Sequence, residues 1–121
     1  MRDFAKVRAR HLGDPLSIRM GGLAADLARV SSIAQNPGNA RAVEVLISDA
    51  RRYIEWTAAE AQPEIGGQLV DIQLALTLWL HAWQRVQLDA TMRSLLAHQS
   101  RCWSDWVLNA SGLLEGESAL T

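Results

Sequence analysis

Residues that break helices divide this chain into four long segments, and that division constrains the fold more than any other feature. Asp14-Pro15 opens the first segment, and residues 36–39 (Asn-Pro-Gly-Asn) close it. Pro63 ends the second segment or begins the third, and residues 89–91 (Asp-Ala-Thr) separate the third from the fourth. Proline interrupts helices because it lacks an N–H donor. Glycine disfavours them because it loses more conformational entropy on folding than any other residue. The chain is therefore expected to form four separate elements.

Apolar residues recur at intervals of three and four within each segment, which places them on one face of an α-helix. The expected core positions are Leu16, Met20, Leu23, Leu27, Val30 and Ala34, then Val43, Leu46, Ile47, Ala50, Tyr53, Ile54, Thr57 and Ala61, then Leu69, Ile72, Leu76, Trp79, Trp83 and Val86, and finally Met92, Leu95, Leu96, Gln99, Cys102, Trp103, Trp106, Ala110 and Leu113. Helices joined by short loops pack as antiparallel neighbours. The sequence predicts an all-α fold, an antiparallel four-helix bundle with up-down-up-down order.

The ends of these helices carry recognisable signals. Asp14 is the expected N-cap of the first helix, with Pro15 at its first helical position. Asp89 is the expected N-cap of the fourth helix, and Gly112 fits its C-terminal cap. Residues 89–91 are the weakest of the breaks, so a single long helix through this point is the alternative.

We expect one bundle domain over residues 14–114, because 121 residues fit one domain with a single core. Residues 1–13 form a basic segment that we expect to be flexible, and residues 115–121 form an expected disordered tail. The basic segment carries Arg2, Lys6, Arg8 and Arg10 against Asp3. A solvated tail explains these charges, and the alternative is an arm for nucleic acid or acidic lipid.

Charge and hydropathy limit the partners. The formal net charge is −1, whereas nucleic-acid-binding proteins usually carry a basic excess. The most apolar stretch, residues 69–83, is too short and too interrupted by polar residues to span a bilayer. We expect residues 1–6 not to belong to a secretory signal, because no apolar run follows their positive charges, and a single cysteine is typical of a reducing compartment. We therefore expect a cytoplasmic protein that binds neither nucleic acid nor membrane.

No residue pattern points to a metal or cofactor. A di-iron bundle requires Glu-x-x-His pairs, but Leu78 and Leu95 lie three residues before His81 and His98. A zinc site requires several closely spaced Cys or His residues, and one cysteine with three scattered histidines does not provide them. We predict no metal and no cofactor.

No pattern points to catalysis either. Cys102 lies on an apolar face, where it is interpreted as a small buried hydrophobe; a reactive thiol near His98 is the alternative. Asp71, His81 and Arg85 are the only titratable side chains gathered on one expected helix face. They are more readily interpreted as a polar rim than as an active site. We predict no catalytic residue and no enzyme.

Several side chains lie off the expected core faces. Trp56 and Val45 fall on the outer strip of the second helix beside Arg52, which can stack on Trp56 four residues later. Large exposed Trp and Arg side chains are enriched at binding hot spots. The predicted interface consists of Val45, Arg52, Trp56, Leu74, Leu78, His81 and Arg85. An irregular bundle whose ends these residues cap is the alternative.

Tryptophan is concentrated in the last two helices. Trp79, Trp83, Trp103 and Trp106 all lie on expected core faces. They are interpreted as core, and the alternative is that they line a pocket for a flat apolar ligand or pigment. Gln99 is expected to lie among them and would need a hydrogen-bond partner, for which a Trp indole N–H is suitable.

The sequence also resembles a family of small, uncharacterised, all-helical proteins of cyanobacteria, over most of its length. The resemblance lies in the stretches His11-Leu12-Gly13-Asp14-Pro15-Leu16, Gly21-Gly22-Leu23-Ala24 and Tyr53-Ile54-Glu55-Trp56-Thr57. It implies a cytoplasmic protein and supplies no site residues.

Two functional hypotheses follow. The first is a non-enzymatic helical module for protein–protein interaction that forms a homodimer or another homo-oligomer, or binds another protein. The second is a carrier of a small apolar ligand or pigment, with a pocket lined by the Trp residues of the third and fourth helices.

Overall fold

The computed structural model describes residues 3–113, and all regular structure in that range is helical. Its α-helices are α1 (Phe4–Gly13), α2 (Leu16–Ile33), α3 (Ala40–Thr57), α4 (Pro63–His81), α5 (Trp83–Val86) and α6 (Ala90–Ala110). Two short 3₁₀ helices, η1 (Pro37–Asn39) and η2 (Ala58–Glu60), flank α3. The all-α prediction is confirmed, and the expected tail at residues 115–121 lies outside the described residues.

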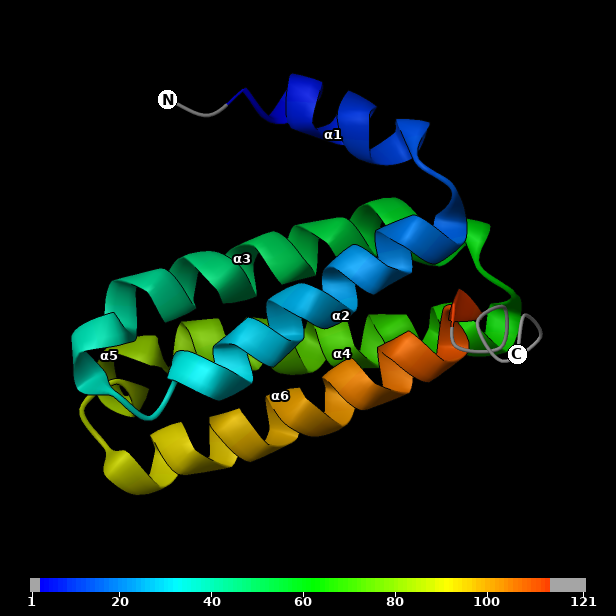
Figure 1. The fold of residues 1–121 in the computed structure, drawn as a ribbon. Helices are drawn as coiled ribbons and strands as arrows, with labels where there is room; N and C mark the ends of the chain where they lie inside the picture. The colour runs from blue at the N-terminus through cyan, green and yellow to red at the C-terminus, as the bar shows by residue number, and fades with distance from the viewer. Residues whose placement is uncertain (1–2, 114–121) are drawn as a thin grey trace.

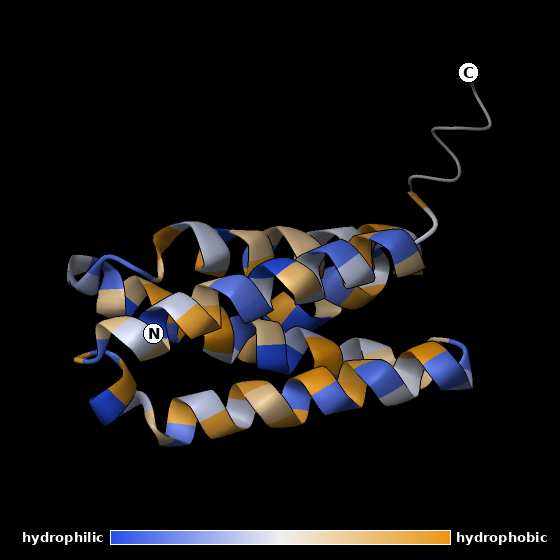
Figure 2. Cartoon of the chain, turned by 90° about the horizontal axis from the view of Figure 1, so that it is seen from below, coloured by the Kyte–Doolittle hydropathy of each residue, from blue (hydrophilic) through white to orange (hydrophobic). Residues whose placement is uncertain are grey.

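The four long helices, α2, α3, α4 and α6, lie side by side, with α1 beside α3 (Figure 1). α2 packs against both α3 and α6, and α3 packs against α4. The backbones of α4 and α6 approach each other much less closely. Hydrophobic residues recur along each helix between hydrophilic ones, as expected for helices that bury one face (Figure 2).

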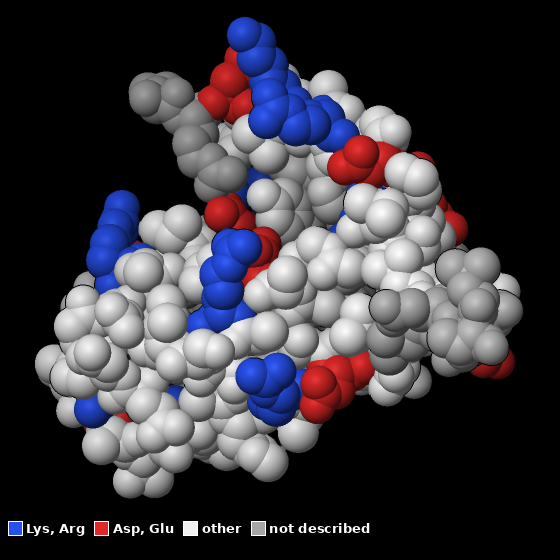
Figure 3. All heavy atoms as spheres, in the orientation of Figure 1, with Lys and Arg blue, Asp and Glu red and all other residues white. Residues whose placement is uncertain are grey.

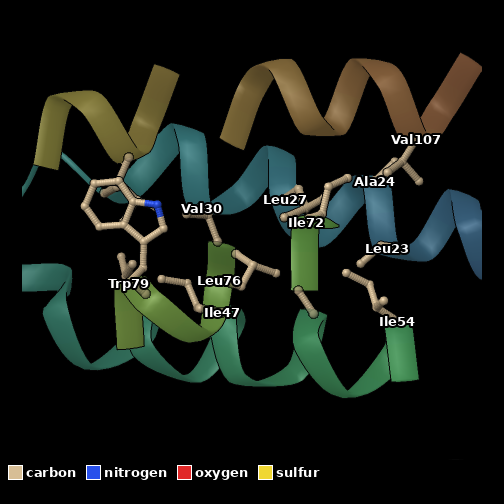
Figure 4. Close-up of a cluster of buried hydrophobic side chains, with 14 of the residues drawn as sticks. Leu23, Ala24, Leu27, Val30, Ile47, Ile54, Ile72, Leu76, Trp79 and Val107 are labelled. Carbon is tan, nitrogen blue, oxygen red and sulfur yellow. The ribbon is translucent and has the colours of Figure 1, made fainter. Parts of the chain in front are cut away.

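The core lies among these four helices, and Leu23, Leu27, Ile47 and Leu76 are almost completely buried in it (Figure 4). The core positions expected in the first three segments supply most of its members. Burying one such side chain contributes about 1.5–3 kcal/mol, so this cluster is the main source of stability.

Three of the expected helix boundaries are confirmed. The Asp89 carboxylate accepts hydrogen bonds from the backbone N–H groups of Thr91 and Met92, at 2.9 and 3.2 Å, and so starts α6 as a separate helix. Pro63 is the first residue of α4, not the last of α3. Gly112 has φ +82°, the left-handed conformation that favours glycine just beyond a helix end.

The start of α2 differs from the expectation by one residue. Pro15 occupies the N-cap position, the helix begins at Leu16, and no side chain caps its first turn. Asp14 instead closes the preceding helix, because its backbone N–H donates to the His11 carbonyl at 3.2 Å. The Asp-Pro signal predicts the start of one helix, whereas in the structure it joins two.

Residues 4–13, expected to be flexible, form helix α1. The Asp3 carboxylate accepts a hydrogen bond from the Lys6 backbone N–H at 3.2 Å, which caps the first turn. Phe4, Val7 and Leu12 recur at helical spacing, but no residue of α1 is buried. Its contacts with α3 hold it in place.

The buried face of α6 differs from the expectation. Cys102, expected in the core, is exposed, whereas Ser100 and Ser104 are buried. The Ser104 hydroxyl donates to the Ala24 carbonyl of α2 at 2.7 Å. Small side chains on this face let α6 approach α2 closely, and the bulkier stripe expected in the core is turned toward α4.

No helix among the described residues combines the length and hydrophobicity that a membrane span requires.

Candidate functional site

The structure distributes the predicted interface residues over three places. Leu74, Leu78 and His81 are exposed along α4, and Arg85 is exposed on α5. Val45 is 39% exposed on α3, outside the α4 strip. The last two, Arg52 and Trp56, lie on α3 where α1 covers it.

Trp56 is half-buried against α1 and not fully exposed as expected, and its place in an interface stays a prediction. The His11 ring stacks on Tyr53, with centroids 4.9 Å apart, and lies tilted against Trp56 at 5.7 Å. The stacking partner of Arg52 is Phe4, with the guanidinium carbon 3.9 Å from the ring centroid. The helical wheel placed Trp56 outside the core, but a wheel treats one helix at a time and could not include the contact with α1.

A polar cluster completes this attachment of α1. The His11 Nε2 shares a hydrogen bond of 3.0 Å with the Thr57 hydroxyl. The buried Arg19 of α2 forms an ion pair with Glu60, and its Nε donates to the Asp14 carbonyl at 3.1 Å. Burial lowers the pKa of His11, and the positive charge of Arg19 lowers it further. The cluster therefore favours a neutral His11.

A hollow of about 310 Å³ lies beside this cluster, with Ile18, Gly22 and Tyr53 among its lining residues. Within residues 3–113 the Arg19 Nη1 atom has no hydrogen-bond partner, and it is buried and out of reach of solvent. Arg19 lines the hollow, but this atom is not exposed to it. The cluster is best explained as the attachment of α1.

A groove between α4 and α6 holds the second concentration of functional side chains. At one end, a cavity of about 320 Å³ is lined by Ala75, Leu78, Trp79, Ala82, Val86, Met92, Leu95 and Gln99. At the other end, a cavity of about 550 Å³ is lined by Gln68, Asp71, Ile72, Cys102, Trp103 and Trp106. Trp103 and Trp106, expected in the core, are half-buried walls of this groove.

Trp79 and Gln99 join the two walls of the groove. The indole Nε1 of Trp79 donates a hydrogen bond to the Gln99 side-chain oxygen at 2.8 Å, which confirms the predicted pairing. Because this bond satisfies the indole N–H, the wall beside it offers mainly apolar contacts. The cavity lined by these two residues is thus suited to an apolar group.

Leu78 and Leu95 line the apolar cavity, and Leu74 lies one helical turn before Leu78 on α4. Leu74 and Leu78 of α4 are 60% and 62% exposed, and Leu95 of α6 is 48% exposed. Asp71 and His81 are exposed on the same helix, beyond the two α4 leucines. Sequence reasoning found the α4 positions but missed Leu95, because it assigned that residue to the core of the fourth helix.

Charge does not single out another site. On the face shown in Figure 3, basic and acidic side chains form small separate groups, and most of that surface carries neither. Within residues 3–113, no three His, Cys, Asp or Glu side chains gather closely enough to hold a metal ion. The exposed pair of Cys102 Sγ and His98 Nε2, 3.8 Å apart, provides two potential ligands. The chemistry that the groove supports best is apolar contact.

Comparison with protein-family models, curated proteins and solved structures gives no significant match. The resemblance to small helical proteins of cyanobacteria therefore stays a prediction.

Proposed function

We propose that this protein is a non-enzymatic interaction module that self-associates through the exposed strip of α4. The strip consists of Asp71, Leu74, Leu78 and His81. The observation that carries the proposal is the 60% and 62% exposure of two leucines one helical turn apart. Large apolar side chains that stay exposed together on one face are typical of a binding surface. We further propose that α2, α3, α4 and α6 form an up-down-up-down bundle, and that the protein is cytoplasmic.

The strip is self-complementary. Its four residues are placed symmetrically about Leu76, with the leucines two positions away on either side and the polar residues five positions away. A two-fold axis through this point would set Leu74 against the partner's Leu78, and Asp71 against the partner's His81. A symmetric dimer makes every such contact twice. The carboxylate of Asp71 could thus accept a hydrogen bond from His81 of a second copy that runs antiparallel.

The experiment that tests this register uses mixed disulfides in a Cys102→Ser background. One chain carries Leu74→Cys and the other carries Leu78→Cys. Mixing them under mild oxidation should give the mixed disulfide, because the two positions face each other across the axis. Each variant alone should crosslink poorly, because two copies of one position are offset by about 6 Å along the helix.

A second experiment changes the polar residues at the two ends of the strip. His81→Glu alone should weaken the dimer in sedimentation, because it places two carboxylates opposite each other. Adding Asp71→Lys should restore the affinity. If all variants and the wild type sediment as monomers at high concentration, and no mixed disulfide forms, self-association through α4 is wrong.

A carrier of a small apolar ligand is the second candidate. The apolar lining of the cavity beside Trp79 favours it. Native mass spectrometry of gently purified protein reports subunit number and retained ligand together. A monomer with a bound apolar molecule would support the carrier over the interaction module.

A further inference from the structure

We propose that α1 is a reversible strap on α3, closed while His11 is neutral and released when the His11 ring takes up a proton. The strap lies over Arg52, Tyr53 and Trp56 of α3, so its release uncovers these three side chains together. This regulatory device is separate from the self-association proposed for α4, and neither proposal depends on the other.

The bundle does not require α1. Every described member of the hydrophobic core, including the partly buried side chains packed against it, lies between Leu16 and Ala110. Helix α1 lies on the outside of the bundle beside α3 (Figure 1), and none of its residues is buried. Asp14 and Pro15, which join α1 to α2, have extended backbone, with ψ of 152° and 151°. A segment with few buried contacts opens at a low cost in free energy, so α1 is able to leave α3 while the core stays folded.

Two aromatic side chains of α1 hold the strap against α3. Phe4 and His11 are seven residues apart, close to two helical turns, so they lie on the same side of α1. The Phe4 ring lies over the Arg52 guanidinium, whose carbon is 3.9 Å from the ring centroid. The His11 ring lies against Tyr53 and Trp56, whose own ring centroids are 5.8 Å apart. The contact spans little more than one turn of α3, so the loss of one anchor weakens the whole strap.

His11 is the titratable anchor. Its ring stacks on Tyr53, and its Nε2 atom shares the 3.0 Å hydrogen bond with the hydroxyl of Thr57, which is 2% exposed. A hydroxyl both donates and accepts, so this bond is available to the neutral and to the protonated ring. Burial of the ring, and after it the positive charge of Arg19, disfavour the proton, and both lower the pKa of His11.

Titratable groups face His11 from each neighbouring element. They are Arg19 of α2, the Tyr53 phenol of α3, Asp14 of the linker and Glu60 of η2. The two carboxylates act against burial and Arg19, but Glu60 is already paired with Arg19, and the pKa of His11 stays below 6.5. A released ring, exposed to water, therefore binds the proton more readily than the strapped ring. The closed strap has its full stability above pH 6.5 and loses it as the pH falls through the lowered value.

The test compares the accessibility of Trp56 at about pH 8 and about pH 5, the range in which histidine titrates. Hydroxyl-radical footprinting labels exposed aromatic side chains, and free tryptophan added to each sample is the reference. We expect labelling of Trp56 to rise about threefold or more in acid in the wild type. His11→Phe keeps an aromatic ring but takes up no proton, so its labelling should not change with pH. His98→Phe, at an exposed histidine of α6, is the matched control and should behave as the wild type.

Hydrogen exchange separates release of the strap from unfolding of the bundle. In acid, residues 8–13 of the wild type should lose protection while core residues such as Leu27 and Ile47 keep it. His11→Ala removes the ring, so Trp56 should be labelled more strongly than in the wild type at both pH values. The proposal is wrong if labelling of Trp56 in the wild type does not depend on pH, if His11→Phe shows the same rise, or if the core loses protection together with α1.

Discussion

Helix α6 meets α2 on one side and α4 on the other, and the two contacts are built differently. Toward α2 it presents small residues, including the buried Ser100 and Ser104, and the two backbones approach closely. Toward α4 it presents bulky residues such as Leu95, Trp103 and Trp106, and the two helices stay apart around a groove. Helix α6 thus packs closely where its side chains are small, and its bulky side chains line the groove instead.

The largest effect is expected from adding bulk to the close contact. Ser104→Leu should destabilise the fold by about 3 kcal/mol, because the site has no room and the hydrogen bond to the Ala24 carbonyl is lost. Cys102→Leu, two residues away and exposed, should change stability by less than about 0.5 kcal/mol. Urea denaturation of both variants measures the difference. Equal losses would mean that α6 does not bury its serine face.

Two adjacent glycines test close packing at the start of α4. A Cβ on Gly66 would lie 2.6 Å from the Ala58 carbonyl oxygen, whereas a Cβ on Gly67 would meet nothing within 4 Å. Gly66→Ala should therefore cost about 2 kcal/mol, because backbone must shift. Gly67→Ala should stabilise α4 by about 0.5–1 kcal/mol, because alanine favours the helix. The melting temperatures of both variants measure these changes. Shifts in the same direction would contradict the close approach of α4 to η2.

Trp56 distinguishes the covered surface beneath α1 from the open strip on α4. Trp56→Ala should loosen α1 at a cost of about 1 kcal/mol, because contacts with His11 and Tyr53 are lost. It should leave the proposed dimer unchanged, since that interface lies on α4. Hydrogen exchange of residues 4–13 and sedimentation measure the two effects. A dimer that dissociates in this variant, with α1 still protected, would place the interface on α3.

The smallest effect is expected from the pH dependence of the α1 attachment. Burial and Arg19 lower the pKa of His11 from 6.5, so the unfolded chain binds its proton more readily than the folded chain. The stability that this residue contributes is therefore complete above pH 6.5 and lost as the pH falls through its lowered folded value. Protection of α1 from hydrogen exchange should decrease in that window in the wild type and not in His11→Gln. An increase in protection on acidification would mean that the pKa of His11 is raised, and not lowered, in the folded chain.

Local chemistry was sufficient for much of the fold. Proline, glycine and capping aspartate located the breaks between helices, because these residues act through their own backbone or the next turn. The hydrophobic stripes of the first three segments identified Leu23, Ile47 and Leu76 as core, because a regular helix repeats its buried face. The pairing of Gln99 with a Trp indole followed from the need of buried polar groups for partners, and the structure identified that Trp as Trp79.

Only the tertiary structure decided which face of α6 is buried and where α1 lies. Hydrophobic periodicity predicts that Trp and Leu are buried and Ser is exposed, whereas a closely packed neighbouring helix requires small side chains. Ser104 is therefore buried, and Cys102, expected in the core, is exposed. Helix α1 is held by contacts of Phe4 and His11 with α3, and the pattern of one helix does not show which distant residues it will meet. The groove between α4 and α6 exists because bulky side chains keep two helices apart, which depends on the positions of both helices and not on the pattern of either one.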